Sequence, residues 1–217
     1  GANVPIMGLI SGWFVAKRRG LASGMAVSGS SFALLLTGIL LPPVMSRQGA
    51  DGWRSGWFLL GAITLVITVA ALLAVKNSPQ QALSETKKPQ SIASYAKSRK
   101  IWILSGLYML FGFSYVIFAT FFARYLVSEG GLSERTVGSM WSAIGGVSVV
   151  SGFLWGVASD RYGRRAALAG IFFVQALAYG IFAFWHAMPG YLVGALLFGL
   201  TAWSIPAVMG ATVGDLY

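Results

Sequence analysis

The residues with the most evident chemistry lie in one short stretch, where a carboxylate and three arginines surround a glycine. The stretch reads Gly156-Val-Ala-Ser-Asp160-Arg161-Tyr-Gly163-Arg164-Arg165. A glycine such as Gly163 permits the tight reversal that joins two antiparallel helices. An aspartate is stabilised near a helix N-terminus, where the dipole favours an anion. Because Ser148, Gly152, Gly156 and Asp160 are spaced four residues apart, they share one helix face. The pattern predicts a tight junction in which Asp160 caps or pairs at a neighbouring helix N-terminus and the arginines anchor the loop in the headgroup region. The small residues on the shared face would let another helix approach closely.

Groups that catalyse reactions or bind metals are missing from the apolar stretches of the sequence. The chain has no cysteine and a single histidine, His186, and its long apolar stretches contain no Asp, Glu, Lys, Arg or His. An enzyme embedded in a membrane would need a cluster of such groups. A soluble cofactor enzyme would need a glycine-rich phosphate loop after a strand. We therefore expect no enzyme, no cofactor and no metal site.

The composition indicates a membrane protein. Hydrophobic residues make up 56% of the chain and charged residues 10%, with a mean hydropathy of +0.72; soluble domains carry about 25% charged residues. Seven apolar segments follow one another, namely 1–16, 21–46, 56–75, 101–123, 136–159, 166–185 and 189–214. Most reach the roughly 18 residues of a spanning helix. Helices satisfy their own backbone polar groups in hydrocarbon. The predicted fold class is all-α, a polytopic membrane protein.

The basic residues indicate how these helices are oriented. Alternate connections, at 17–20, 76–100 and 160–165, hold twelve of the 16 Lys and Arg residues. Basic residues prefer the cytoplasmic side, so these three connections are predicted to face the cytoplasm. The net charge of +10 therefore reflects topology, which excludes a nucleic-acid partner. Residues 76–100 are polar, contain two prolines and are too long for a helix turn, which predicts a cytoplasmic linker.

Three stretches resemble one transporter family. The loop at Asp160 resembles the G-x-x-x-D-R-x-G-R-R/K loop of the Major Facilitator Superfamily, which in that family recurs between helices 2–3 and 8–9. The run Trp13-Phe14-Val-Ala-Lys17-Arg18-Arg19-Gly20 and the small residues after it are similar to that family's junction of helices 4 and 5. The run Gly52-Trp53-Arg54-Ser-Gly-Trp57 resembles the entry to helix 6. The resemblance covers essentially the whole chain, as helices 4 to 10. It leaves open a bacterial monocarboxylate or organic-anion branch or an uncharacterised subgroup.

The resemblance implies a twelve-helix architecture of two bundles. Residues 1–75 would end the N-terminal bundle (helices 4–6), 76–100 would be the linker, and 101–217 would begin the C-terminal bundle (helices 7–10). The Asp160 loop would stabilise the outward-open state by docking near residues 17–20 of the other bundle. The implied gating residues are Gly156, Asp160, Arg161, Gly163, Arg164, Arg165, Arg19 and Gly20.

Neutral polar groups near the middle of the helices are the candidates for solute contact. The resemblance places some of them on helices that line the central cavity in this family. The candidate cavity residues are Tyr108, Tyr115, Trp203, Ser204, Ser28 and Ser142. Pro206 would bend the last segment, which would help a helix to open and close a cavity.

The predicted function is that of a secondary transporter, which moves a small solute by alternating access in the cytoplasmic (inner) membrane. A small organic anion is one such solute. The partners are the solute, the lipid bilayer and, if transport is coupled, a proton or ion; the protein would act as a monomer. The alternatives are a non-transporting sensor or scaffold of the same fold, and a drug or metabolite exporter of the same superfamily.

Overall fold

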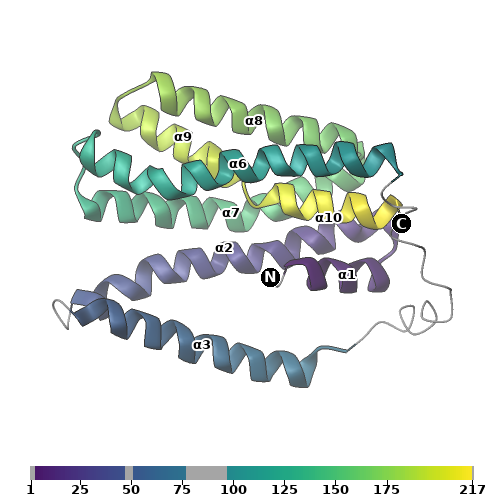
Figure 1. Cartoon of the computed structure of the whole chain (residues 1–217), viewed down its shortest axis with the longest axis horizontal. Helices are drawn as coiled ribbons and strands as arrows, with labels where there is room; N and C mark the ends of the chain where they lie inside the picture. Colours follow the sequence, from purple (N-terminus) through teal and green to yellow (C-terminus); the bar gives the residue numbers. More distant parts are fainter. Residues whose placement is uncertain (1–2, 47–50, 77–96, 217) are drawn as a thin grey trace.

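The computed structural model describes residues 3–46, 51–76 and 97–216, and almost all of them are helical (Figure 1). The predicted all-α class is confirmed. Most of the predicted linker, residues 77–96, lies outside the described residues. In chain order the helices are α1 (Asn3–Trp13), α2 (Ala16–Ser46), α3 (Gly52–Ala74), α6 (Arg99–Ser128), α7 (Glu134–Tyr162), α8 (Arg164–Phe184), α9 (Met188–Thr201) and α10 (Ser204–Leu216).

Six stretches among the described residues are long and apolar enough to cross a bilayer. They are Ala16–Leu41, Gly52–Ala74, Arg99–Ser128, Glu134–Tyr162, Arg164–Phe184 and Met188–Leu216. Each covers the roughly 20 residues that span about 30 Å of hydrocarbon. The predicted first segment corresponds to α1, of which the structure describes the 11 residues Asn3–Trp13.

Two junctions are tighter than the sequence predicts. The basic run at 17–20 was expected to form a loop, but it lies inside α2, and only Phe14 and Val15 separate α1 from α2. Arg161 and Tyr162 likewise complete α7, so that Gly163 alone separates α7 from α8. Its φ of 89° falls in the left-handed region that glycine adopts most easily. The charged residues at these two junctions therefore belong to the ends of helices and not to loops between them.

The last apolar segment, residues 189–214, is interrupted just before Pro206. α9 ends at Thr201 and α10 begins at Ser204, two residues before Pro206. A proline lacks an amide donor and its ring clashes with the carbonyl four residues earlier, so the helix breaks at this point. The break lies in the interior of the structure, since Ala202 and Ser204 are buried.

Helix α7 lies at the centre of the arrangement. It contacts α2, α6, α8, α9 and α10, and its contact with α2 is the most extensive of any helix pair. α1, α2 and α3 lie on one side of this contact, and α6 to α10 lie on the other (Figure 1). Within the described residues α3 packs only against α2, and apolar side chains such as Leu72 and Leu73 are about 80% exposed, at 78% and 80%. Such a surface suits contact with lipid.

The two sides of α7 are packed by different residues. Small residues bring α2 and α7 close together, whereas aromatic side chains fill the space among α6, α8 and α9. Phe118 of α6 stacks on Phe198 of α9 with ring centroids 3.9 Å apart, and it also contacts Phe182 of α8 at 5.3 Å. Stacked and edge-on rings at these separations add to the stabilisation from burial.

Candidate functional site

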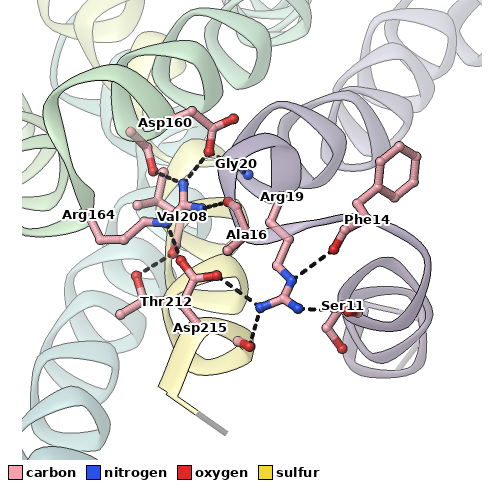
Figure 2. Close-up of polar contacts among 12 residues, drawn as sticks. Ser11, Phe14, Ala16, Arg19, Gly20, Asp160, Arg164, Val208, Thr212 and Asp215 are labelled. Carbon is pink, nitrogen blue, oxygen red and sulfur yellow. Dashed lines mark hydrogen bonds and ion pairs between the residues drawn. The ribbon is translucent and has the colours of Figure 1, made fainter. Parts of the chain in front are cut away.

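Asp160, near the end of α7, binds the backbone of α2. Its two carboxylate oxygens accept hydrogen bonds from the Gly20 amide at 3.0 Å and the Leu21 amide at 2.8 Å (Figure 2). These donors lie in the second turn of α2, near the end where the helix dipole favours an anion. The contact joins residues 140 positions apart in the sequence. It therefore links the segment before residues 76–100 to the segment after them.

Arg164, the first residue of α8, completes this contact from the other side of Gly163. Its guanidinium donates to the Asp160 carboxylate at 2.6 Å and to the Ser159 hydroxyl at 2.5 Å. It also donates to the carbonyl oxygen of Ala16 at 2.9 Å. Because Ala16 and Gly20 are four residues apart, they are ordinary hydrogen-bond partners within a helix. In the first turns of α2, the Gly20 amide thus donates to Asp160, and the Ala16 carbonyl accepts from Arg164.

A second carboxylate, Asp215 near the end of α10, extends the network. It accepts from the Arg164 Nε at 2.8 Å through one oxygen and from Arg19 at 3.0 Å through the other. Arg19 also donates to the carbonyl oxygens of Gly214, Ser11 and Phe14. Two carboxylates and two arginines therefore connect α1, α2, α7, α8 and α10 (Figure 2). We call Arg19, Asp160, Arg164 and Asp215 the charge network.

The backbone can approach this closely only because the contact residues are glycines. A Cβ atom at Gly20 would lie 2.5 Å from the Asp160 carboxylate and 2.7 Å from the Gly156 carbonyl oxygen. A Cβ at Gly156 would lie 2.5 Å from the Gly20 carbonyl oxygen. The small residues of α2 and α7 thus bring the Asp160 carboxylate within hydrogen-bond distance of the α2 amides.

The structure divides the residues that the sequence nominates for gating. Gly20, Gly156, Asp160, Gly163 and Arg164 lie at the contact, and Arg19 reaches it through Asp215. Arg161 and Arg165 point away: both are exposed, and the Arg161 guanidinium lies 5.5 Å from the ring centroid of the adjacent Tyr162. Arg161 and Arg165 are one and five residues from Asp160, and this spacing alone does not fix the direction in which their side chains point.

The sequence reasoning missed Asp215. It lies just after the last apolar segment, outside any motif, and its partners Arg19 and Arg164 are 196 and 51 positions away. The available signal was its charge: Asp215 is one of six acidic residues in the chain and follows an uncharged stretch that begins after Arg165 and is interrupted only by His186. A carboxylate at the same predicted membrane face as Arg19 and Arg164 could have been considered as their partner.

The six candidate cavity residues do not gather around one space. Ser28 donates to the Val149 carbonyl across the α2–α7 contact at 2.8 Å, and Ser142 lies against Gly38 of α2. Ser204 is buried and donates to the Ser151 hydroxyl at 3.1 Å. These three serines therefore take part in helix–helix contacts, as Ser and Thr do in other membrane bundles.

The three aromatic candidates lie along α6 and at the α9–α10 break. Tyr115 stacks on Phe198 with ring centroids 6.0 Å apart and meets Trp203 edge-on at 5.8 Å. Tyr108 is 45% exposed and packs on Phe111. A cavity of about 400 Å³ opens between α6 and α8 and is lined by none of the six candidates. Its lining residues are Ser114, Ile117, Phe118, Phe121, Phe122, Tyr125, Tyr179 and Phe182.

Side chains of α7 support the break between α9 and α10. The Ser148 hydroxyl donates to the Gly199 carbonyl at 2.7 Å, and the Trp155 indole donates to the Leu200 carbonyl at 2.9 Å. Carbonyls in the last turn of a helix lack intrahelical donors, and in a membrane such groups must be satisfied by protein. The sequence predicted a bend at Pro206, but it predicted neither a full break nor these donors. No group of three or more His, Cys, Asp or Glu suited to a metal occurs in the part of the chain described.

The amino-acid sequence is similar to those of known transporters. The sequence profile described as Major Facilitator Superfamily matches residues 1–217. The chain is 27% identical to the probable sulfoacetate transporter SauU of Cupriavidus necator over 70% of its own length and 39% of that protein. It is 27% identical to the hexuronate transporter of Bacillus subtilis over 76% of the chain and 40% of that protein. It is 30% identical to the probable galactarate/D-glucarate transporter GarP of Escherichia coli, over 72% and 41%.

The chain thus aligns with about 40% of the length of each of these relatives. No solved structure is significantly similar to it. The family profile covers every residue of the chain, six stretches of the described residues are of membrane-spanning length, and Asp160 contacts the Gly20 amide beside Arg19. The chain is a multi-pass membrane protein and belongs to the Major Facilitator Superfamily.

Proposed function

We propose that this chain forms part of a secondary transporter that moves small organic anions across the cytoplasmic membrane by alternating access. The observation that carries the proposal is the contact of Asp160 with the amides of Gly20 and Leu21. It fastens the segment before residues 76–100 to the segment after them, at the face where basic residues gather. A carrier needs such a contact that closes one side of the membrane and can be broken.

The names of the relatives support the class of solute. Sulfoacetate, hexuronates and galactarate or D-glucarate, named for three relatives, are small molecules that carry at least one carboxylate. Another relative is the alpha-ketoglutarate permease of Escherichia coli, 26% identical over 70% of the chain. The apolar stretches of this chain offer such an anion hydroxyl and indole donors but no cation.

The assignment of residue ranges to two bundles and a linker is part of the same proposal. Residues 1–75 and 101–217 would be parts of two bundles joined by a cytoplasmic linker at 76–100. The position of α1–α3 and α6–α10 on opposite sides of the α2–α7 contact supports this division. The charge network would close the cytoplasmic side and so stabilise the outward-open state, with the transporter acting as a monomer.

Uptake into proteoliposomes tests the proposal. The protein expressed from its native gene would be reconstituted and offered labelled sulfoacetate, glucuronate, D-glucarate and 2-oxoglutarate. We expect saturable uptake of at least one anion, well above that of protein-free liposomes. Dissipating the proton or sodium gradient then shows whether uptake is coupled. Uptake equal to that of protein-free liposomes for every solute contradicts the proposal and favours a sensor or scaffold of the same fold.

Export is a second candidate, and one relative favours it. The agnestins efflux protein AgnL12 of Paecilomyces divaricatus is 29% identical over 95% of the chain and 46% of that protein. The discriminating measurement is the direction of net flux in whole cells. Expression that lowers the internal concentration of a preloaded carboxylate supports export, and expression that raises accumulation from the medium supports import.

A further inference from the structure

Three buried serines meet near the middle of the bilayer, where α7 faces the break between α9 and α10. The Ser204 hydroxyl donates to the Ser151 hydroxyl at 3.1 Å, and Ser151 donates to the Ser148 carbonyl at 2.9 Å. All three residues are 0% exposed. Ser148 and Ser204 lie near the centres of the spans Glu134–Tyr162 and Met188–Leu216. We call Ser148, Ser151 and Ser204 the serine cluster.

The serine cluster offers more oxygen acceptors than it has protons. The Ser148 hydroxyl oxygen lies 2.7 Å from the Ile144 carbonyl and also 2.7 Å from the Gly199 carbonyl of α9. A serine hydroxyl carries a single proton, so it cannot donate fully to both carbonyls. The oxygen atoms gathered here therefore keep lone pairs that no proton of the cluster fills.

The helix break adds further carbonyl oxygens. The last turn of α9 presents carbonyls without intrahelical donors, and it carries the negative end of the helix dipole. Pro206 has no amide, so the Ala202 carbonyl lacks the donor that a continuous helix would give it. The same proline removes one amide from the first turn of α10. Because Ala202 is 1% exposed, this carbonyl-rich point is shielded from bulk water.

A fourth hydroxyl, that of Ser31 on α2, is buried at 0% exposure and has no hydrogen-bond partner among the described residues. The α2–α7 contacts on either side of it are Ser28 with Val149 and Leu35 with Gly145. Ser31 lies three residues from one contact and four from the other, so it shares their face of α2. This register places Ser31 at the level of Ser148. An unpartnered buried hydroxyl is unfavourable, and its oxygen is available to a ligand.

The oxygens at this point suit a hard cation of low charge. Hydroxyl and carbonyl oxygens bind hard cations, but divalent ions in proteins are usually held by carboxylates. A bound proton would need a titratable group, and the apolar stretches contain no Asp, Glu, Lys, Arg or His. Carbonyls at the ends of broken helices coordinate sodium in other transporters. We propose that the serine cluster, Ser31 and the carbonyls at the end of α9 bind a sodium ion.

This site rests on the proposed function and deepens it, because it names the coupling ion. The apolar stretches offer an organic anion no positive charge, and a bound sodium ion provides one near mid-depth. Trp203, next to Ser204, meets Tyr115 edge-on at 5.8 Å, so two candidate cavity residues adjoin the site. Each ligand then raises the affinity for the other by the same factor, which couples anion uptake to the sodium gradient.

Sodium-dependent stability tests the site without a transport assay. The protein expressed from its native gene would be purified in detergent, and its midpoint of thermal unfolding measured in sodium chloride and in choline chloride at equal ionic strength. A ligand that binds the folded state raises this midpoint as its concentration exceeds the dissociation constant. We expect a saturable rise with sodium, lost in Ser31→Ala and Ser148→Ala. Ser23→Ala changes another buried serine of α2, about two turns nearer the cytoplasm, and should keep the rise.

The choline measurement separates loss of the ion from loss of folding. In choline chloride Ser31→Ala should unfold at the midpoint of the unmodified protein or above it, because the change removes a buried unpartnered hydroxyl. Ser31→Ala therefore decides the matter even if Ser148→Ala does not fold. An equal midpoint in the two salts for the unmodified protein overturns the site. A sodium-dependent rise of the same size in Ser31→Ala overturns it as well.

Anion uptake into proteoliposomes distinguishes failure of the site from failure of the proposed function. An inward sodium gradient should raise the initial rate of uptake by about fivefold or more, the lower end of coupling between two bound ligands, and Ser31→Ala should abolish that increase. Uptake that is the same with and without sodium overturns the proposal. A sodium-dependent midpoint in a protein that transports none of the anions supports the site and refutes the proposed function.

Discussion

Asp160 is a mostly buried carboxylate whose charge is compensated from two directions. Its side chain is 13% exposed, and it accepts hydrogen bonds from two backbone amides of α2 and from Arg164. A buried charge persists only when it is paired in this way. Hydrogen bonds to charged groups contribute about 1.5–3 kcal/mol each. Hydrogen bonds of this strength can bias a two-state equilibrium, which is what the proposed gating role of Asp160 requires.

Asp160→Asn removes the charge and keeps the shape of the side chain. An amide accepts through one oxygen only, so at least one of the α2 amides and the ion pair with Arg164 are lost. A loss of about 1.5–3 kcal/mol would shift the equilibrium towards the cytoplasm-open form by roughly tenfold to a hundredfold. We expect reduced uptake at unchanged expression. The same initial rate of uptake in variant and unmodified protein would contradict the gating role of Asp160.

Arg164 and Arg165 provide a matched pair for testing geometry against charge. Arg164→Lys keeps the positive charge but loses the planar fork that reaches Asp160, Asp215 and the Ala16 carbonyl together. Arg165→Lys changes an exposed neighbour. We expect slower uptake for Arg164→Lys and wild-type uptake for Arg165→Lys. Unchanged uptake in both variants would mean that the positive charge alone matters at this membrane face, which would contradict a geometric role for Arg164.

Sequence reasoning could identify Asp160 but not Asp215, and the physical reason is distance along the chain. Asp160 and Gly163 belong to a local pattern, since a helix end, a reversal and a helix start require particular residue types in order. Asp215 acquires its role only when α10 is placed beside Arg19, 196 positions away. The sequence also could not predict whether Ser28 and Ser142 face a neighbouring helix or a cavity, because uniformly apolar helices give no periodic signal for the buried face.

At the scale of helices, the α2–α7 contact depends on glycines at the points where the two backbones come closest. A Cβ at Gly24 would overlap the Gly152 carbonyl group, lying 2.7 Å from its carbon. Gly29 on the same helix faces open space. Both small-residue ridges could be recognised from their four-residue spacing, but their mutual contact over the whole helix length could not, since any two such ridges are compatible partners.

Gly24→Val should separate α2 from α7, and Gly29→Val should not. Overpacking a close contact costs about 1–3 kcal/mol, while the two substitutions change intrinsic helix propensity equally. We expect a lower midpoint of thermal unfolding in detergent for Gly24→Val alone. A similar midpoint for both variants would show that the close α2–α7 contact does not contribute to stability.

The α9–α10 break depends on a donor from α7. Trp155→Phe keeps an aromatic ring but removes the hydrogen bond to the Leu200 carbonyl. Interhelical hydrogen bonds in membranes contribute about 0.6 kcal/mol on average and up to about 2 kcal/mol. We expect a modestly lower unfolding midpoint for Trp155→Phe and no change for Trp57→Phe, since Trp57 on α3 is 69% exposed. The reverse order of the two midpoints would contradict a supporting role for Trp155.

At the scale of the whole molecule, the sequence was most informative about class and topology. Hydropathy and the alternation of basic residues predict membrane helices and their orientation, because the bilayer imposes both. They do not predict which helix is central, since that depends on packing. The structure places α7 at the centre and leaves α3 held by α2 alone among the described residues.

Labelling of single cysteines tests the orientation of the molecule. Arg135 at the start of α7 and Arg165 at the start of α8 are exposed residues at opposite ends of the helices. We expect a membrane-impermeant maleimide to label Arg135→Cys in intact cells and Arg165→Cys only after the cells are opened. Labelling of both sites in intact cells would contradict the topology and the assignment of the charge network to the cytoplasmic side.

The central claim is that the contact of Asp160 with α2 closes the cytoplasmic side and opens during transport. Spin labels at Lys17 of α2 and Arg161 of α7, both exposed beside this contact, report their separation by pulsed electron resonance in liposomes. We expect mainly one short distance in the otherwise unmodified protein, and a second, longer distance that gains population with Asp160→Asn. The same single distance with and without the Asp160 carboxylate would contradict the account.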